Sequence, residues 1–280
     1  MKIWTVAANY LTPVALCLII SLGFVKMYTS SGLTQSLPRT ASWNLFEQLV
    51  WILAPAVLGF LGVTGLYWLI SKHKDFELRV LFSIVVAPTS AILVIVVSQT
   101  LLTVIAKTYS SFMVTLTVLI SLYVAVFSVV FILSNAFSTT VRNFIFILYG
   151  ALLGSFMSLL LPTVSLVLLL VSIALYDLVM FNSKWIVSIV RDLSLSRGVG
   201  SKFGYIGQNV EIGIGELIFY SFVPAHVEAY YDFPLLVLTL LMTAAGVMLN
   251  MLILSKKGFL AGLPAPILLG LIPLVVSLAM

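Results

Sequence analysis

The segment GIGELI, residues 213–218, places Glu216 inside a long apolar stretch, and the segment ALYDLV, residues 174–179, places Asp177 inside the preceding one. An acidic residue at the middle of a bilayer costs about 2.5–3.5 kcal/mol on insertion scales. Ionisable residues inside membrane segments are therefore functional candidates by default. These two acids are the first candidates for chemistry in the chain.

The composition is that of a polytopic membrane protein. Of 280 residues, 62% are hydrophobic and 8% are charged, whereas soluble domains have about 45–50% apolar and about 25% charged residues. The formal net charge of +5 fits basic cytoplasmic loops, so we expect no nucleic-acid partner. The single cysteine, Cys17, excludes an intrachain disulfide and offers no metal cluster. We expect the apolar run that follows Lys2 to be a retained transmembrane helix, because no small-residue cleavage site follows it.

The apolar runs predict an all-α protein with nine transmembrane helices. A tight turn at Pro162 separates the fifth and sixth. Most of the 14 Lys and Arg residues then fall on the side of Lys2, and only Lys26, Arg39 and Lys107 fall on the other. The positive-inside rule places the N-terminus in the cytoplasm and the C-terminus outside. The predicted spans are residues 4–25, 47–70, 79–99, 111–133, 142–161, 163–183, 211–225, 234–254 and 261–280.

The chain reads as a single membrane domain in two parts joined by a polar segment. Residues 1–183 form a six-helix part and residues 211–280 a three-helix part. The connecting residues, 184–210, are predicted to be a cytoplasmic loop with an interfacial amphipathic helix, because apolar residues recur there at helical spacing.

The two acids are predicted to lie at similar depth on consecutive antiparallel helices. Two carboxyls close together in a low dielectric cannot both ionise, so one keeps a proton while the other acts as a base. Such a pair activates water and polarises a carbonyl, which is the chemistry of peptide hydrolysis without a covalent intermediate. Both histidines, His73 and His226, are predicted in loops, and no His/Glu cluster has metal-ligand spacing. A proton relay, a transport role and a non-catalytic remnant remain alternatives.

Glycines and prolines mark further candidate positions. Gly213 and Gly215 allow close approach of either another helix or an extended substrate. The spacing of Gly150 and Gly154 is typical of ordinary helix packing. The PAP segment, residues 264–266, fits either a helix N-terminus or backbone freed from helical bonds beside a wet cavity.

Tyr176-Asp177 in a sixth span, Gly213-x-Gly215-Glu216 in a seventh and Pro264-Ala265 at a ninth together resemble the presenilin and signal peptide peptidase family of intramembrane aspartyl proteases. Among its members, the chain looks like an archaeal presenilin homologue. The resemblance implies a nine-helix fold in a prokaryotic cell membrane, Asp177 and Glu216 as the catalytic pair, and transmembrane proteins as substrates. It implies that the substrate contacts fall on Tyr176, Gly213, Gly215, Pro264, Ala265 and Pro266, with no cofactor.

Two positions depart from the family pattern. Glu216 stands where the family has aspartate, and Pro266 stands where it has leucine. An extra methylene moves a carboxyl by about 1.5 Å, and misplacement by about 1 Å can reduce a rate a hundredfold. Three alternatives to an active protease therefore stay open: a catalytically impaired homologue, a prepilin-type peptidase and a proton-coupled transporter. The prepilin-type peptidases also carry Gly-x-Gly-Asp in membrane helices. Homo-oligomerisation stays open as well.

The expected mechanism requires a substrate helix to unwind and to pair as a strand with enzyme backbone. Residues 203–206 and the PAP segment are the candidate strand edges.

Overall fold

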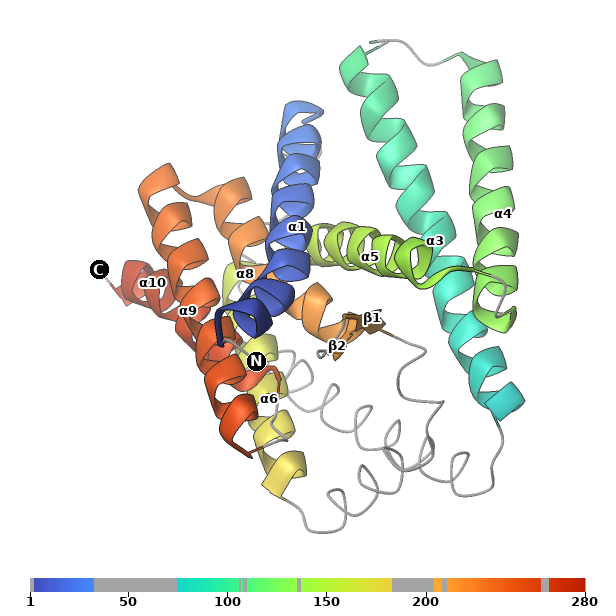
Figure 1. Ribbon diagram of the computed structural model, residues 1–280. Helices are drawn as coiled ribbons and strands as arrows, with labels where there is room; N and C mark the ends of the chain where they lie inside the picture. Colours follow the sequence, from blue (N-terminus) through green and yellow to red (C-terminus); the bar gives the residue numbers. More distant parts are fainter. Residues whose placement is uncertain are drawn as a thin grey trace.

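A computed structural model of the chain describes residues 3–32, 75–105, 107, 110–134, 137–182, 204–207, 211–257 and 262–279. Helices dominate it, because a helix satisfies its own backbone hydrogen bonds where lipid offers none. In chain order the elements are α1 (Ile3–Ser30), α3 (Asp75–Ile105), α4 (Ser111–Leu133), α5 (Thr139–Leu160), α6 (Thr163–Asn182), β1 (Gly204–Ile206), β2 (Glu211–Gly213), α8 (Ile214–Tyr230), α9 (Phe233–Lys257) and α10 (Pro264–Ala279) (Figure 1).

Five of the described helices are long and apolar enough to cross a membrane, and two more are apolar but shorter. The chain is therefore an integral, multi-pass membrane protein. Every predicted span except 47–70 corresponds to one described helix. That span, and the amphipathic helix predicted early in the 184–210 loop, lie outside the described residues. Nine spans and the orientation of the termini remain predictions.

The predicted start of the seventh span is wrong. Residues Glu211–Gly213 form strand β2, and α8 begins only at Ile214, with Gly213 as its N-cap residue. Gly213 disfavours helix at the end of this segment, and β2 pairs instead with β1 in an antiparallel ladder that places Gly204 opposite Gly213. The described part of the predicted loop thus includes a strand.

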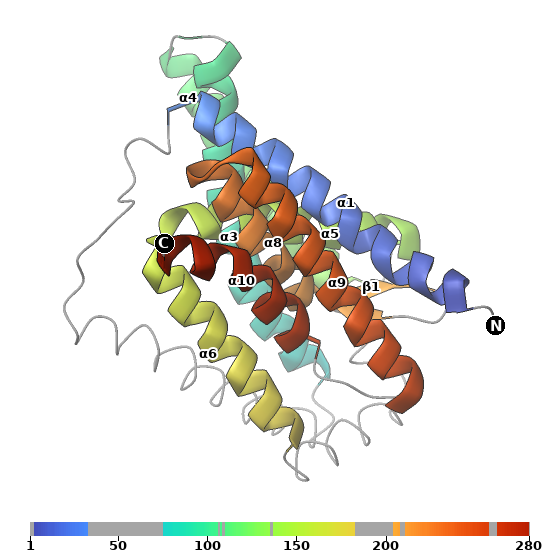
Figure 2. The same cartoon turned by 90° about the vertical axis from the view of Figure 1, so that its left-hand side faces the viewer.

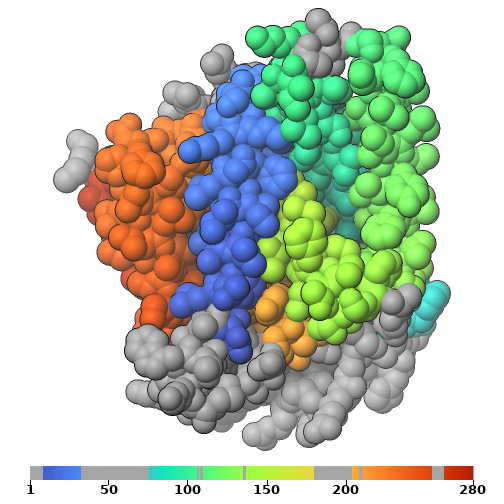
Figure 3. Space-filling model, turned by 45° about the horizontal axis from the view of Figure 1, so that its top comes forward, coloured from blue at the N-terminus to red at the C-terminus, as the bar shows by residue number. Residues whose placement is uncertain are grey.

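Helix α8 is the centre of the packing. It contacts α1, α5, α9 and α10, and it contributes residues to two buried clusters. One cluster joins α8 to α1, α5 and α9, and the other joins it to α6, α9 and α10. Figure 2 shows α6 beside α10, with α9 on the far side of α10. Figure 3 shows α1 running between α9 and the group formed by α3 and α5. Helices α3 and α4 pair with each other at the edge of the bundle.

Two glycines of α5 let α8 approach closely. A Cβ at Gly150 would lie 2.9 Å from the Leu217 Cβ. At Gly154 it would meet the Ser221 hydroxyl and would lie 2.7 Å from the Ile218 carbonyl oxygen. This close approach of α8 at both glycines confirms the helix-packing interpretation of the Gly150-x-x-x-Gly154 pattern.

The turn between α5 and α6 falls at Leu161 and Pro162, as predicted, and the Pro162 carbonyl accepts the first helical bond of α6. His226 holds this turn from α8, so its predicted place in a loop is wrong, because α8 continues to Tyr230. Its Nδ1 lies 2.8 Å from the Ser158 carbonyl, which can only accept, so Nδ1 carries the proton. Nε2 therefore accepts from the Thr163 hydroxyl at 3.0 Å.

Gly154→Ala is expected to destabilise the fold, because the new methyl group would clash with the Ile218 carbonyl in the backbone of α8. That backbone can shift only together with the rest of the helix. We expect the free energy of unfolding to fall by about 1–3 kcal/mol, measured as a lower thermal unfolding temperature in detergent. Gly23→Ala is the matched control, since a Cβ there meets no described atom within 4 Å and alanine favours a helix. Equal losses in both variants would contradict the packing role of Gly154.

Candidate active site

Glu216 lies in the first turn of α8, directly after the strand β2. Two buried tyrosines approach its carboxyl. The Tyr10 hydroxyl, from α1, lies 3.4 Å from Oε2, and the Tyr220 hydroxyl, one turn further along α8, lies 3.2 Å from the same oxygen. Tyr10 is 4% exposed and Tyr220 is 2% exposed. The acid thus faces the interior of the bundle with polar partners on two helices.

Asp177 lies near the end of α6 and contacts the start of α10. Its Oδ2 accepts the Leu263 backbone N–H at 3.1 Å. The Leu263 carbonyl accepts from the Ile267 N–H, so Leu263 directly precedes the helix as its cap. A carboxylate is favoured at this position, because the N-terminal end of a helix carries partial positive charge.

Glu216 contacts Gly262, the residue that precedes Leu263 in the same turn. A Cβ at Gly262 would collide with the Glu216 carboxyl, so the missing side chain makes the room that the carboxyl occupies. The Gly262 carbonyl accepts from the Tyr220 hydroxyl at 2.8 Å and from the Asn250 amide of α9. Asp177 and Glu216 thus converge on the two consecutive residues Gly262 and Leu263.

The PAP segment forms the first turn of α10, which favours the helix N-terminus over freed backbone. Pro264 and Pro266 are buried and have no N–H, so they leave fewer unpaired donors at a buried helix end. Gly246 of α9 packs on this turn, since a Cβ there would lie 2.5 Å from the Pro266 Cα and 2.6 Å from the Ala265 carbonyl oxygen. The prediction that this segment offers a strand edge is wrong, because its backbone is helical.

The second predicted strand edge does form a strand, β1, but its outer side is occupied. Asn143 of α5 donates to the Ile206 carbonyl at 2.8 Å and accepts from the Ile206 N–H at 2.9 Å. Since N–H and C=O groups of alternate residues point to opposite sides of a strand, the Ile206–Glu211 pair is not bonded across the ladder. The N–H groups of Glu211 and Gly213 therefore point outward from β2, and both residues are exposed.

The remaining predicted substrate positions are Gly213, Gly215 and Tyr176. A Cβ at Gly215 meets no described atom within 4 Å, and the nearest atoms to one at Gly213 belong to Glu216, at 4.0 Å. Neither glycine is thus packed against another described helix. The Tyr176 hydroxyl, next to Asp177, is buried without a hydrogen-bond partner in the described part of the chain.

Sequence reasoning missed Tyr10, Tyr220, Asn250 and Asn143. Asn250 could have been found from the sequence, because a lone side-chain amide in an apolar span needs a hydrogen-bond partner within the bundle. Tyr220 lies one helical turn after Glu216, so its spacing on one face was also visible. Tyr10 gave no such signal, since its partner is distant in sequence.

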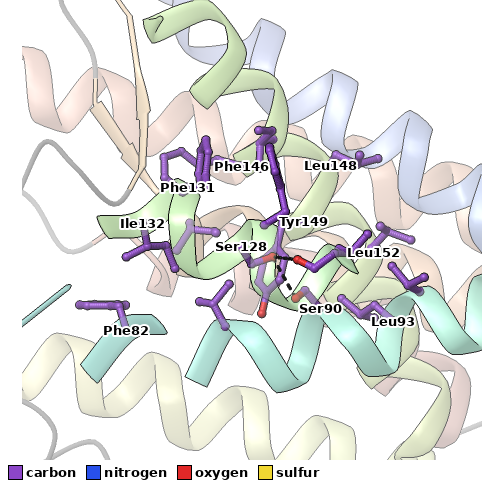
Figure 4. A pocket seen from close by; sticks show the side chains of 16 residues that line it. Phe82, Ser90, Leu93, Ser128, Phe131, Ile132, Phe146, Leu148, Tyr149 and Leu152 are labelled. Carbon is purple, nitrogen blue, oxygen red and sulfur yellow. Dashed lines mark hydrogen bonds between the residues drawn. The ribbon is translucent and has the colours of Figure 1, made fainter. Parts of the chain in front are cut away.

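A separate cavity of about 370 Å³ lies between α3, α4 and α5 and reaches Ile214 at the start of α8 (Figure 4). Its lining residues include no acid or base. The hydroxyls on its wall are already bonded, Ser128 to Ser90 at 3.0 Å and Tyr149 to Thr89. The cavity therefore suits apolar groups and offers no hydrolytic chemistry. Among the described residues no group of His, Cys, Asp and Glu could hold a metal ion.

No protein-family model matches the sequence, and no curated protein matches it. The fold does match a solved structure, described as that of a presenilin family intramembrane aspartate protease. The TM-score is 0.60, and the match covers 100% of this chain and 99% of that chain at 16% sequence identity. The chain therefore has a presenilin-like fold over its whole length.

The bond from Asn250 to the Gly262 carbonyl is expected to stabilise the site. Asn250→Leu keeps the volume but removes the donor, and we expect a loss of about 1–3 kcal/mol in unfolding free energy. Thr243→Val is the matched control on α9, because the buried Thr243 hydroxyl has no partner among the described residues and its removal should cost nothing. Thermal unfolding of both variants in detergent measures the difference; equal losses would contradict the role of Asn250.

Proposed function

We propose that this chain is an intramembrane aspartyl-type protease that cleaves transmembrane substrate helices with Asp177 and Glu216 as its acid–base pair. The observation that carries the proposal is the convergence of both carboxyls on the Gly262–Leu263 turn. The presenilin-like fold supports the class of enzyme. The choice of residues rests on the contacts of this chain alone.

The hydrogen-bond partners of Tyr220 support one choice of which acid holds the shared proton. A tyrosine hydroxyl has one proton to donate, and the Gly262 carbonyl, at 2.8 Å, is nearer than Glu216 Oε2, at 3.2 Å. If Tyr220 donates to Gly262, its contact with Glu216 is favourable only when Glu216 is protonated and donates to the tyrosine oxygen. Asp177, which accepts a backbone N–H, is better suited to stay ionised. We therefore take Glu216 as the acid and Asp177 as the base.

The reaction then proceeds in two steps. Asp177 removes a proton from a water molecule as the water oxygen bonds to the scissile carbonyl carbon, while Glu216 gives its proton to the carbonyl oxygen. The resulting gem-diol loses a proton back to Glu216, the C–N bond breaks, and Asp177 returns its proton to the leaving nitrogen. The Leu263 bond to Oδ2 fixes the Asp177 carboxyl and leaves Oδ1 for the water.

The substrate must present an extended segment, because a helical peptide bond is shielded and its carbonyl is already bonded. The outward N–H groups of β2 are suited to pair with such a segment as an added strand. This edge leads directly into Gly213, Ile214 and Gly215, so a paired strand would run past Glu216. The Tyr176 hydroxyl, which has no partner among the described residues, is a candidate further donor to the substrate from α6.

Asp177→Asn and Glu216→Gln are each expected to reduce cleavage of a reconstituted single-span substrate by at least about a hundredfold, which is the usual contribution of a general acid or base. The measurement is the rate of product formation in proteoliposomes. Glu228→Gln is the matched control, since Glu228 lies near the other end of α8 from Glu216 and its ion pair with exposed Lys26 is long, at 3.8 Å.

Three outcomes separate the alternatives. Absence of cleavage by the folded wild-type chain across varied substrates would identify an impaired homologue. Cleavage confined to prepilin-type substrates would indicate a prepilin peptidase. Proton flux that depends on Asp177, without cleavage, would indicate a transporter.

Gly213→Pro tests the strand edge. Gly213 has φ −63°, which proline adopts without strain, so the variant removes the outward N–H and keeps the backbone. We expect cleavage to fall about tenfold, the effect of one lost hydrogen bond of about 1.4 kcal/mol. Gly213→Ala keeps the N–H and should retain most activity. Equal activity of the two variants would exclude strand pairing at this position.

A further inference from the structure

The carboxyl of Glu216 fills a space that the surrounding residues shape closely. Three features define what we call the carboxyl pocket: the Tyr10 hydroxyl, the Tyr220 hydroxyl and the bare Cα of Gly262. Both hydroxyls contact the same oxygen, Oε2. A side chain at Gly262 would collide with both carboxyl oxygens and with the carbon that bears them.

The pocket matches the length of a glutamate. The tyrosine contacts, at 3.4 and 3.2 Å, are already near the long limit for a hydrogen bond. An aspartate at position 216 would withdraw the carboxyl by about one C–C bond, roughly 1.5 Å. Its oxygens would then lose both hydroxyls, and the space beside Gly262 would be empty.

The loss would also take the carboxyl partner away from two buried hydroxyls. Tyr10 and Tyr220 belong to the buried core, where a hydroxyl without a partner costs about 1–3 kcal/mol. Tyr220 keeps the Gly262 carbonyl in either case. Among the described residues, Tyr10 has no other acceptor except Tyr220 itself. The hydrogen bond between α1 and the site, from Tyr10 to Glu216, thus depends on the length of the Glu216 side chain.

We propose that Tyr10, Tyr220 and Gly262 are positioning residues that adapt this site to glutamate, so that Glu216 is the required acid and aspartate is the inferior one. The catalytic consequence rests on the proposed protease function; the fit of the pocket does not. Because the two parts are separable, one experiment tests the pocket by stability and a second tests its effect on cleavage.

The first experiment is a double-mutant cycle read by thermal unfolding of the purified full chain in detergent. Gly262→Ala should lower the unfolding temperature by several degrees when residue 216 is glutamate. In the Glu216→Asp background the same substitution should lower it by less than half as much, because the shorter acid vacates the space. Gly215→Ala, where a Cβ meets no described atom within 4 Å, should cause no drop in either background. Equal losses from Gly262→Ala in both backgrounds would overturn the pocket.

The second experiment measures kcat and KM for the single-span substrate. Tyr10→Phe and Tyr220→Phe should each lower kcat about tenfold with KM unchanged, since they act on the acid and not on the substrate. Tyr149→Phe, which removes a hydroxyl bonded to Thr89 away from the site, should leave both constants unchanged. Glu216→Asp should be at least tenfold slower than wild type. The double variant Gly262→Ala with Glu216→Asp should be more active than Gly262→Ala alone.

A faster or equally fast Glu216→Asp enzyme would overturn the proposal, as would tyrosine variants with unchanged kcat. If wild type cleaves no substrate, the proposed function fails, and the thermal cycle then decides on the carboxyl pocket by itself.

Discussion

The turn formed by Gly262 and Leu263 is the contact on which the site depends. Its N–H binds Asp177 of α6, its carbonyl binds Tyr220 of α8 and Asn250 of α9, and its missing side chain admits Glu216. Backbone groups before a helix are free to make such bonds, because they have no partner within the helix. One irregular turn, placed where four helices meet, thus satisfies polar groups that an apolar bundle would otherwise leave unpaired.

This arrangement requires that α8 be buried on nearly every side. Gly150 and Gly154 let α5 approach it, and Gly246 similarly lets α9 approach the start of α10. Within a membrane, apolar burial does not drive helices together. Their association depends instead on close packing, which small residues allow. The glycines therefore set the distance between backbones, and that distance determines whether side chains from α1, α6 and α8 can meet. The geometry of the site therefore depends on the packing of the helices around α8.

The sequence predicted those features that depend on local pattern. Apolar runs gave each described helix, with ends that differ by up to about six residues, and the cost of a buried charge singled out Asp177 and Glu216. It could not predict β2, because three residues carry no periodicity and the pairing with β1 decides their conformation. It could not predict Tyr10 either, since a tyrosine near a helix end is ordinary until its distant partner is known. Long-range contacts, which carry no local pattern, account for both failures.

The extra methylene of Glu216 can be absorbed either by the backbone or by the neighbouring side chains. Moving α8 outward would open its contacts with Gly150 and Gly154, which are closed to within van der Waals distance. It would also weaken both buried clusters, because α8 belongs to each of them. Changing the neighbours requires only an absent side chain at position 262 and two hydroxyls at the correct reach. Under the proposed carboxyl pocket the chain takes the second route, which leaves the presenilin-like backbone in place.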